Sequence, residues 1–296
     1  YSGVLQWESA NEKVRTTFEY LRAETDARLN EFAVLAQVND DALFPVVAPG
    51  TTPTFDGNQV ETITLTQFSP FNPAGGIPTE TLRFQREDEA MTEDFSGQVE
   101  FFPTDRLSFN VEAQRITSTR SENGLIGAMQ TFADVAIDNS GETPVVQFLR
   151  PGAGSSPAEY FTDPDLTYYW FLIDNQVRNQ GKLDSLQIDA DYEVSDNAFF
   201  RRAKFGARWA DRNRITRSAN FSNWGNLSAP WQGRNGTWGY SDPGAFGGGA
   251  YVSDFPAFAE IRNPFGDDFQ RGTVPVPLGD GSAFFFGGDN LVEEYL

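Results

Sequence analysis

The sequence SLQIDADYEV, which occupies residues 185–194, alternates strictly between polar and apolar side chains. A β-strand turns successive side chains to opposite faces, so this stretch has one wholly apolar face and one polar face. The polar face carries three carboxylates, those of Asp189, Asp191 and Glu193. Such a strand occurs in a water-soluble sandwich, and also in a transmembrane barrel whose apolar face meets lipid.

The same alternation recurs in three pairs of runs, and each pair is joined by a short polar turn. We expect the strand pairs near 1–24, 82–120 and 182–217, with turns at 9–13, 103–105 and 195–198. Between the pairs lie long segments that are rich in Gly, Pro and acidic residues, at 31–81, 121–181 and 218–296. These segments are predicted as loops. Within the first of them, residues 27–38 could form a short amphipathic helix and residues 62–68 an extra strand.

Composition excludes several classes of function. The chain has 296 residues and a net charge of −20, which is too acidic for a protein that neutralises nucleic-acid phosphates. It has no cysteine and no histidine, and therefore no disulfide, no thiolate metal site and no imidazole base. The acidic segments show no recognised calcium spacing. We expect no enzymatic activity, no cofactor and no metal site.

Short turns at one end of the strands and long polar loops at the other are typical of outer-membrane barrels. Soluble sandwiches rarely insert such long loops at every second connection. The sequence therefore predicts an all-β fold, an antiparallel transmembrane β-barrel segment of about six strands with short periplasmic turns and long extracellular loops. Even small barrels need about eight strands, so we expect this chain to be a portion of a larger barrel.

Specific stretches strengthen this interpretation. They are KFGARWADR at 204–212 with NWGNL at 223–227, GQVEFFPTDRL at 97–107, and FQRG at 269–272 with the Phe- and Gly-rich tail. Together they resemble the barrel strands and loops of TonB-dependent receptors of the bacterial outer membrane. The most similar group is the large-loop subfamily typical of alphaproteobacteria and xanthomonads.

The resemblance implies a barrel of about 22 strands that is closed by an amino-terminal plug domain. It further implies active uptake of a carbohydrate or a siderophore, energised by the inner-membrane TonB system through the plug. Residues 1–296 contain no recognisable plug or TonB-binding box, so we expect an early-to-middle portion of the barrel. Lipid and lipopolysaccharide of the outer membrane are the other implied partners.

Aromatic residues of the last long segment are candidate ligand contacts, because sugars bind by laying their apolar faces on aromatic rings. The candidates are Trp224, Trp231, Trp238 and Tyr240. The alternative is that these rings pack the loop into a self-supporting lid.

The polar faces of the last strand pair predict a charged wall along an aqueous lumen. The candidate lumen-facing residues are Asp189, Asp191, Glu193, Arg202, Lys204 and Arg208. Opposite charges on neighbouring antiparallel strands attract each other, so a salt-bridged wall is one interpretation. A charged track that guides ligand or contacts the plug is the other.

Two further classes of function stay open on the sequence alone. The first is a secreted all-β protein that binds or cleaves glycans, with the aromatic loop and a pair of strand carboxylates as its site. The second is a surface adhesion or assembly module that uses the loops as interfaces.

Overall fold

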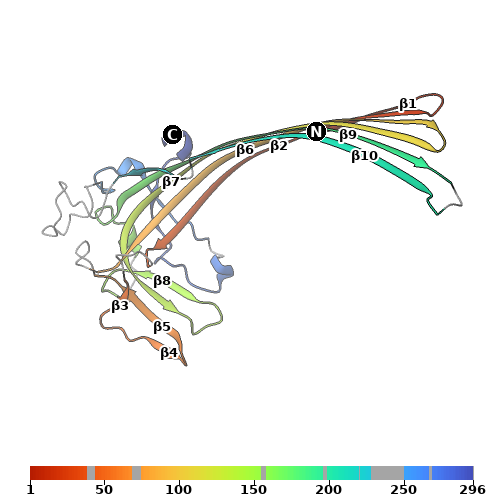
Figure 1. Cartoon of the computed structure of the whole chain (residues 1–296). Coiled ribbons are helices and arrows are strands. Elements are labelled where there is room, and N and C mark those ends of the chain that lie inside the picture. The colour runs from red at the N-terminus through yellow and green to blue at the C-terminus, as the bar shows by residue number, and fades with distance from the viewer. Residues whose placement is uncertain are drawn as a thin grey trace. The chain divides into compact units, whose positions relative to one another are not determined.

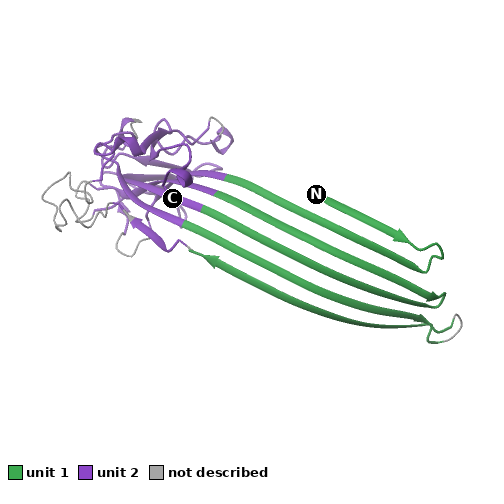
Figure 2. Cartoon of the chain, turned by 90° about the horizontal axis from the view of Figure 1, so that it is seen from above, with its two compact units in different colours: residues 1–28, 87–123, 175–220 green, residues 29–86, 124–174, 221–296 purple. Residues whose placement is uncertain are grey.

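The computed structural model describes residues 1–38, 44–68, 75–154, 158–195, 199–219, 221–227, 250–266 and 269–295. Its fold is all-β with antiparallel pairing, as the alternation predicted. The chain divides into two compact units (Figure 2). Unit 1 comprises residues 1–28, 87–123 and 175–220, and unit 2 comprises residues 29–86, 124–174 and 221–296.

Unit 1 contains β1 and β10 and parts of four longer strands of a larger sheet, in the order β1-β2-β6-β7-β9-β10 (Figure 1). The strands are β1 Ser2–Glu8, β2 Val14–Ala36, β6 Ile77–Thr104, β7 Leu107–Asp138, β9 Tyr168–Glu193 and β10 Arg202–Ser218. Each strand pairs with its neighbour in the order of the chain, which is an up-and-down meander. The three predicted hairpins are therefore confirmed as β1–β2, β6–β7 and β9–β10.

Short connections join β1 to β2 and β6 to β7 at one end of unit 1 (Figure 2). In the first, the Ser9 amide donates to the Val14 carbonyl at 2.9 Å and the Val14 amide donates to Ser9 Oγ at 2.9 Å. The second turn is Asp105 and Arg106 alone, because Pro103 and Thr104 remain in β6. A proline is tolerated at a strand end, where its missing N–H costs no ladder bond. Residues 196–198 of the third turn lie outside the described residues.

The long strands extend far into segments that were predicted as loops. Residues 121–138 belong to β7 and residues 168–181 belong to β9, so the predicted loop bounds were wrong there. Most of β7 between Glu122 and Val135 is buried, and a strand covered on both faces loses the apolar–polar alternation. The helix expected at 27–38 was also wrong, because β2 continues to Ala36 and pairs with β6.

Shorter strands and helical turns complete unit 2. The strands are β3 Val46–Val47, β4 Thr54–Asp56, β5 Gln59–Thr66, β8 Val145–Leu149, β11 Asn223–Asn226, β12 Ala259–Arg262 and β13 Ala283–Phe286. The helices are α1 Ala158–Phe161, η2 Pro256–Phe258, η3 Phe269–Gly272 and α2 Leu291–Tyr295. Strand β5 pairs with β7, which confirms the extra strand expected in the first long segment.

Three side chains at every second position of β6 hold the β13–α2 segment in unit 2 by hydrogen bonds. Thr81 Oγ1 donates to the Phe284 carbonyl at 2.6 Å, and Arg83 Nη1 donates to the carbonyls of Phe286 and Gly288 at 2.9 and 2.7 Å. Gln85 Nε2 donates to Asn290 Oδ1 at 2.7 Å and its Oε1 accepts from the Leu291 amide at 2.9 Å. These bonds satisfy the polar groups that the segment buries.

Strand β7 packs closely against Phe286 of β13. A Cβ on Gly127 of β7 would lie 2.5 Å from the Phe286 ring, so only glycine fits. Phe286 then packs with Leu125, Met129 and Leu291 in one buried apolar cluster.

A buried carboxyl, Glu80, also lies on β6 in unit 2. Its side chain accepts a hydrogen bond from the Gln37 amide, and the residue is 5% exposed. Burial raises the pKa of Glu80 to about 7, although the hydrogen bond from Gln37 opposes the shift. Folding therefore favours the protonated form of the Glu80 carboxyl over its ionised form, relative to the unfolded chain.

We expect the Glu80→Gln variant to be more stable than the wild type at pH 8, by up to about 3 kcal/mol, and about equally stable at pH 4. The pKa of Glu80 is raised on folding, so the wild type loses stability as the pH rises from about 4.5 to about 7. The free energy of unfolding by urea, measured across this range, tests the expectation. Glu142→Gln, at an exposed site, is the control. An unaltered pH profile in E80Q would contradict it.

Candidate functional site

The β9–β10 hairpin of unit 1 has two chemically different faces. The register places Leu186 opposite Trp209, Ile188 opposite Ala207, and Ala190 opposite Phe205. These pairs lie on one face, as the alternation predicted, and their large side chains are exposed. Phe205 is 72% exposed and Trp209 is 59% exposed.

The other strands of unit 1 continue this surface. Leu5 of β1 is opposite Phe18 of β2, and the Tyr20 and Phe95 rings lie 4.6 Å apart between their centroids. A shallow groove lined by Leu5, Phe18, Phe95 and Trp209, among others, crosses the sheet. We call the exposed set the apolar face: Leu5, Trp7, Phe18, Phe95, Val99, Phe101, Leu186, Ile188, Tyr192, Phe205 and Trp209.

Charged residues bound the apolar face on the side away from the short turns. Arg22 lies two positions beyond Tyr20 and pairs with Glu93 at 3.4 Å. Asp184 lies two positions beyond Leu186 and pairs with Arg115 at 2.6 Å and with Lys182 at 2.7 Å. On this side of the sheet, the side chains thus change from apolar to charged between residues that are two positions apart along a strand.

The opposite face, which we call the polar face, holds the predicted lumen-facing residues near the short turns. Asp191 pairs with Arg202 at 3.0 Å and with Lys204 at 3.2 Å, and Glu193 pairs with Arg202 at 3.0 Å. Asp189 accepts from Gln187 Nε2 at 2.7 Å. The structure therefore brings these acids and bases together as a compensated ladder. Exposed pairs of this kind contribute about 0–1 kcal/mol each.

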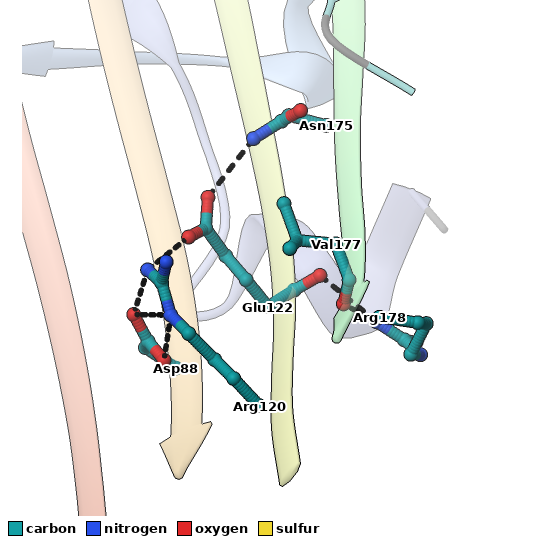
Figure 3. Close-up of polar contacts among 6 residues, drawn as sticks. All are labelled: Asp88, Arg120, Glu122, Asn175, Val177 and Arg178. Atoms are coloured by element: carbon teal, nitrogen blue, oxygen red, sulfur yellow. Dashed lines mark hydrogen bonds and ion pairs between the residues drawn. The ribbon is translucent and has the colours of Figure 1, made fainter. Parts of the chain in front are cut away.

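Farther along the polar face lies a network that the sequence did not reveal (Figure 3). Arg120 Nε donates to Asp88 Oδ1 at 3.0 Å, and Arg120 Nη2 contacts Glu122 Oε2 at 2.6 Å. The nearly buried Glu122 also accepts from Asn175 Nδ2 at 2.9 Å. The bond to Asp88 raises the pKa of the Arg120 guanidinium, so this arginine stays charged and paired.

Between the ladder and this network the polar face is hollowed. The hollow, of about 700 Å³, is lined by Arg120, Arg208, Arg212 and Arg214 and by the small residues Ala90, Ser118 and Gly181. A Cβ on Gly181 would lie 2.6 Å from Ser118 Oγ, so glycine keeps the floor open there. Sequence reasoning selected Arg208 for this face, but not the cavity or its other arginines as a group.

The aromatic candidates are only partly within the described residues. Trp224 lies on β11 in unit 2, where its ring centroid is 4.0 Å from that of Phe171 and about half of the residue is exposed. It is thus both a packing residue and an accessible ring. Trp231, Trp238 and Tyr240 lie outside the described residues.

We expect the Glu122→Ala variant to lose about 2 kcal/mol of unfolding free energy, because the buried Asn175 amide and one side of Arg120 lose their acceptor. The free energy of unfolding by urea measures the loss. Glu142→Ala, at an exposed site, serves as the matched control and should change stability little. Equal stabilities of the two variants would show that the network is not stabilising.

Comparisons with known proteins add no relative: no protein-family model matches the chain, and no curated protein matches its sequence. Within the described part of the chain, no helix is long and apolar enough to span a membrane.

Proposed function

We propose that this chain forms part of the β-barrel wall of a bacterial outer-membrane transporter that takes up a nutrient in a TonB-dependent manner. The observation that carries the proposal is the apolar face of unit 1, which lies exposed on a sheet whose other face is ionic. In the proposal the apolar face meets lipid and the polar face borders a water-filled passage.

An exposed apolar surface of this extent needs a partner. Soluble monomers rarely expose contiguous apolar patches larger than a few hundred Å², and larger patches mark interaction surfaces. The apolar face draws large exposed side chains from five of the six strands of unit 1, namely β1, β2, β6, β9 and β10. Hydrocarbon chains are the partner that suits a broad surface without directional polar groups.

The dimensions of the apolar face support the same partner. From Leu186 in β9 to the exposed Val194 just beyond the strand, this side of the hairpin covers nine residues. A tilted strand needs about 9–11 residues to cross a membrane. The charged border of the apolar face at Arg22, Arg115 and Asp184 would lie among the headgroups and lipopolysaccharide, with Trp7 and Tyr192 near the opposite interface.

The edges of the sheet set a further requirement. Within the described residues, β1 pairs with β2 alone and β10 pairs with β9 alone, so each has one unpaired edge. Unpaired backbone groups are costly in hydrocarbon. The proposal therefore requires additional strands that close the wall.

The nature of the transporter rests on the resemblance of residues 97–107, 204–212 and 223–227 to TonB-dependent receptors. It supports uptake of a carbohydrate or a siderophore, coupled to the TonB system through a plug. The protein in this proposal performs no covalent chemistry. Trp224 supports the carbohydrate alternative, because its ring is about half exposed.

We expect the Phe205→Arg variant to reach the outer membrane at a greatly reduced level, because an arginine on the lipid face costs about 2–4 kcal/mol near the bilayer midplane. Ser108→Arg, on the polar face of β7 beside Asp189 and Asp191, is the matched control and should leave the level unchanged. Quantitative blots of purified outer membranes measure both variants.

Extraction provides the decisive observation. The wild-type protein should sediment with outer membranes and require detergent for release. A wild-type protein that is monodisperse in buffer without detergent would overturn the proposal and favour the secreted glycan-binding alternative.

A further inference from the structure

We propose that the hollow on the polar face of unit 1 binds a small hydroxylated anion, such as a sugar acid or a sugar phosphate. That this anion is the transported substrate rests on the proposed function. That it binds here rests on the hollow alone. It narrows the ligand class from carbohydrates in general to acidic ones.

The first argument is the distribution of charge along β10. Near the short turns, the register pairs Arg202 with Glu193 and Lys204 with Asp191, so each base faces an acid. Farther along, Arg208 faces Gln187, Arg212 faces Leu183, and Arg214 faces Gly181. The compensation of charge therefore ends where the hollow begins.

The second argument is that three of the four arginines form no ion pair with the residues that the structure describes. In the described part of the chain, Arg208, Arg212 and Arg214 form no ion pair, whereas Arg120 is held by Asp88 and Glu122. The nearby acids Asp184 and Asp211 lie opposite each other on the other side of the sheet. Like charges at alternate positions, about 7 Å apart along a strand, repel each other until an anion binds.

The third argument is the shape of the hollow. Its floor is made of Ala90, Ser118 and Gly181, which leave room above the sheet in a volume of about 700 Å³. A monosaccharide fits in a cavity of this size, since small-molecule sites occupy about 300–1,000 Å³. Guanidinium groups around such a space can hold carboxylate or phosphate oxygens with paired hydrogen bonds.

The fourth argument identifies the rest of the ligand. Asn179 lines the hollow, and its Oδ1 atom is buried and lacks a hydrogen-bond donor among the described residues. A deprotonated carboxylate only accepts hydrogen bonds, whereas a hydroxyl group can donate one to this oxygen. The hydroxyls of Thr92 and Ser118 line the same space and can serve as further partners. A ligand with one acidic group and several hydroxyls therefore matches the lining.

The test is titration calorimetry of the protein in detergent with three probes: D-glucuronate, glucose 6-phosphate and glucose. We expect the two anions to bind and glucose to bind at least tenfold more weakly. The stronger of the two anions distinguishes a carboxylate site from a phosphate site. Weakening of the anion affinity with rising salt should accompany binding.

The variants Arg212→Gln and Arg214→Gln should each weaken anion binding about tenfold, and the double variant more. Arg202→Gln is the matched control, because Arg202 lies on the same face but is already paired with Asp191 and Glu193. Asn179→Leu should weaken binding of the hydroxylated anions but not that of acetate or sulfate, which have no hydroxyl donor.

Three results would overturn the inference: no anion binding, equal binding of glucose and glucuronate, or full affinity in the R212Q R214Q variant with correct folding by circular dichroism. Extraction from membranes is measured on the same protein. Absence of binding in a membrane-inserted protein removes the inference but leaves the proposed function. Anion binding by a protein that is soluble without detergent supports the binding site but removes the proposed function.

Discussion

The period of two along a β-strand is the constraint on which unit 1 depends. Six strands hydrogen-bond side by side, so every second side chain is committed to the apolar face and every other one to the polar face. A shift of one residue in the pairing of β9 with β10 would move Leu186 and Ile188 among the charges. The register keeps Leu186 opposite Trp209 and Asp191 opposite Lys204 at the same time.

In unit 2 the same strands are largely buried rather than exposed. There the side chains of β6 and β7 are covered by other segments, and the polar ones are satisfied by backbone groups rather than by water. Arg83 illustrates this, since it is 1% exposed and donates to the carbonyls of Phe286 and Gly288. A polar residue on a strand therefore lies on a solvent-exposed face in unit 1. In unit 2 it is buried and holds a neighbouring segment by hydrogen bonds.

The polar face of unit 1 is graded along its length. Acid–base pairs fill the part near the short turns. Farther along, the hollow is lined by Arg208, Arg212 and Arg214, which form no ion pair among the described residues. A ladder of pairs is electrostatically satisfied and suits a wall. Uncompensated arginines concentrate positive potential in a chain whose net charge is −20, which suits an anion that must be distinguished from its surroundings.

The sequence by itself determined the three hairpins, the faces of residues 185–194 and 203–209, and the mixed charges beside Asp191, because local alternation in an exposed strand has one interpretation. Only the tertiary structure decided that β2, β7 and β9 continue through the segments predicted as loops. In β7 and in the first part of β9, burial on both faces erases the alternation. The continuation of β2 is exposed or half-buried, and its apolar and charged residues do not alternate. The structure alone also assembled the hollow, since Arg120, Gly181 and Arg214 are distant in sequence and meet through the pairing of β7, β9 and β10.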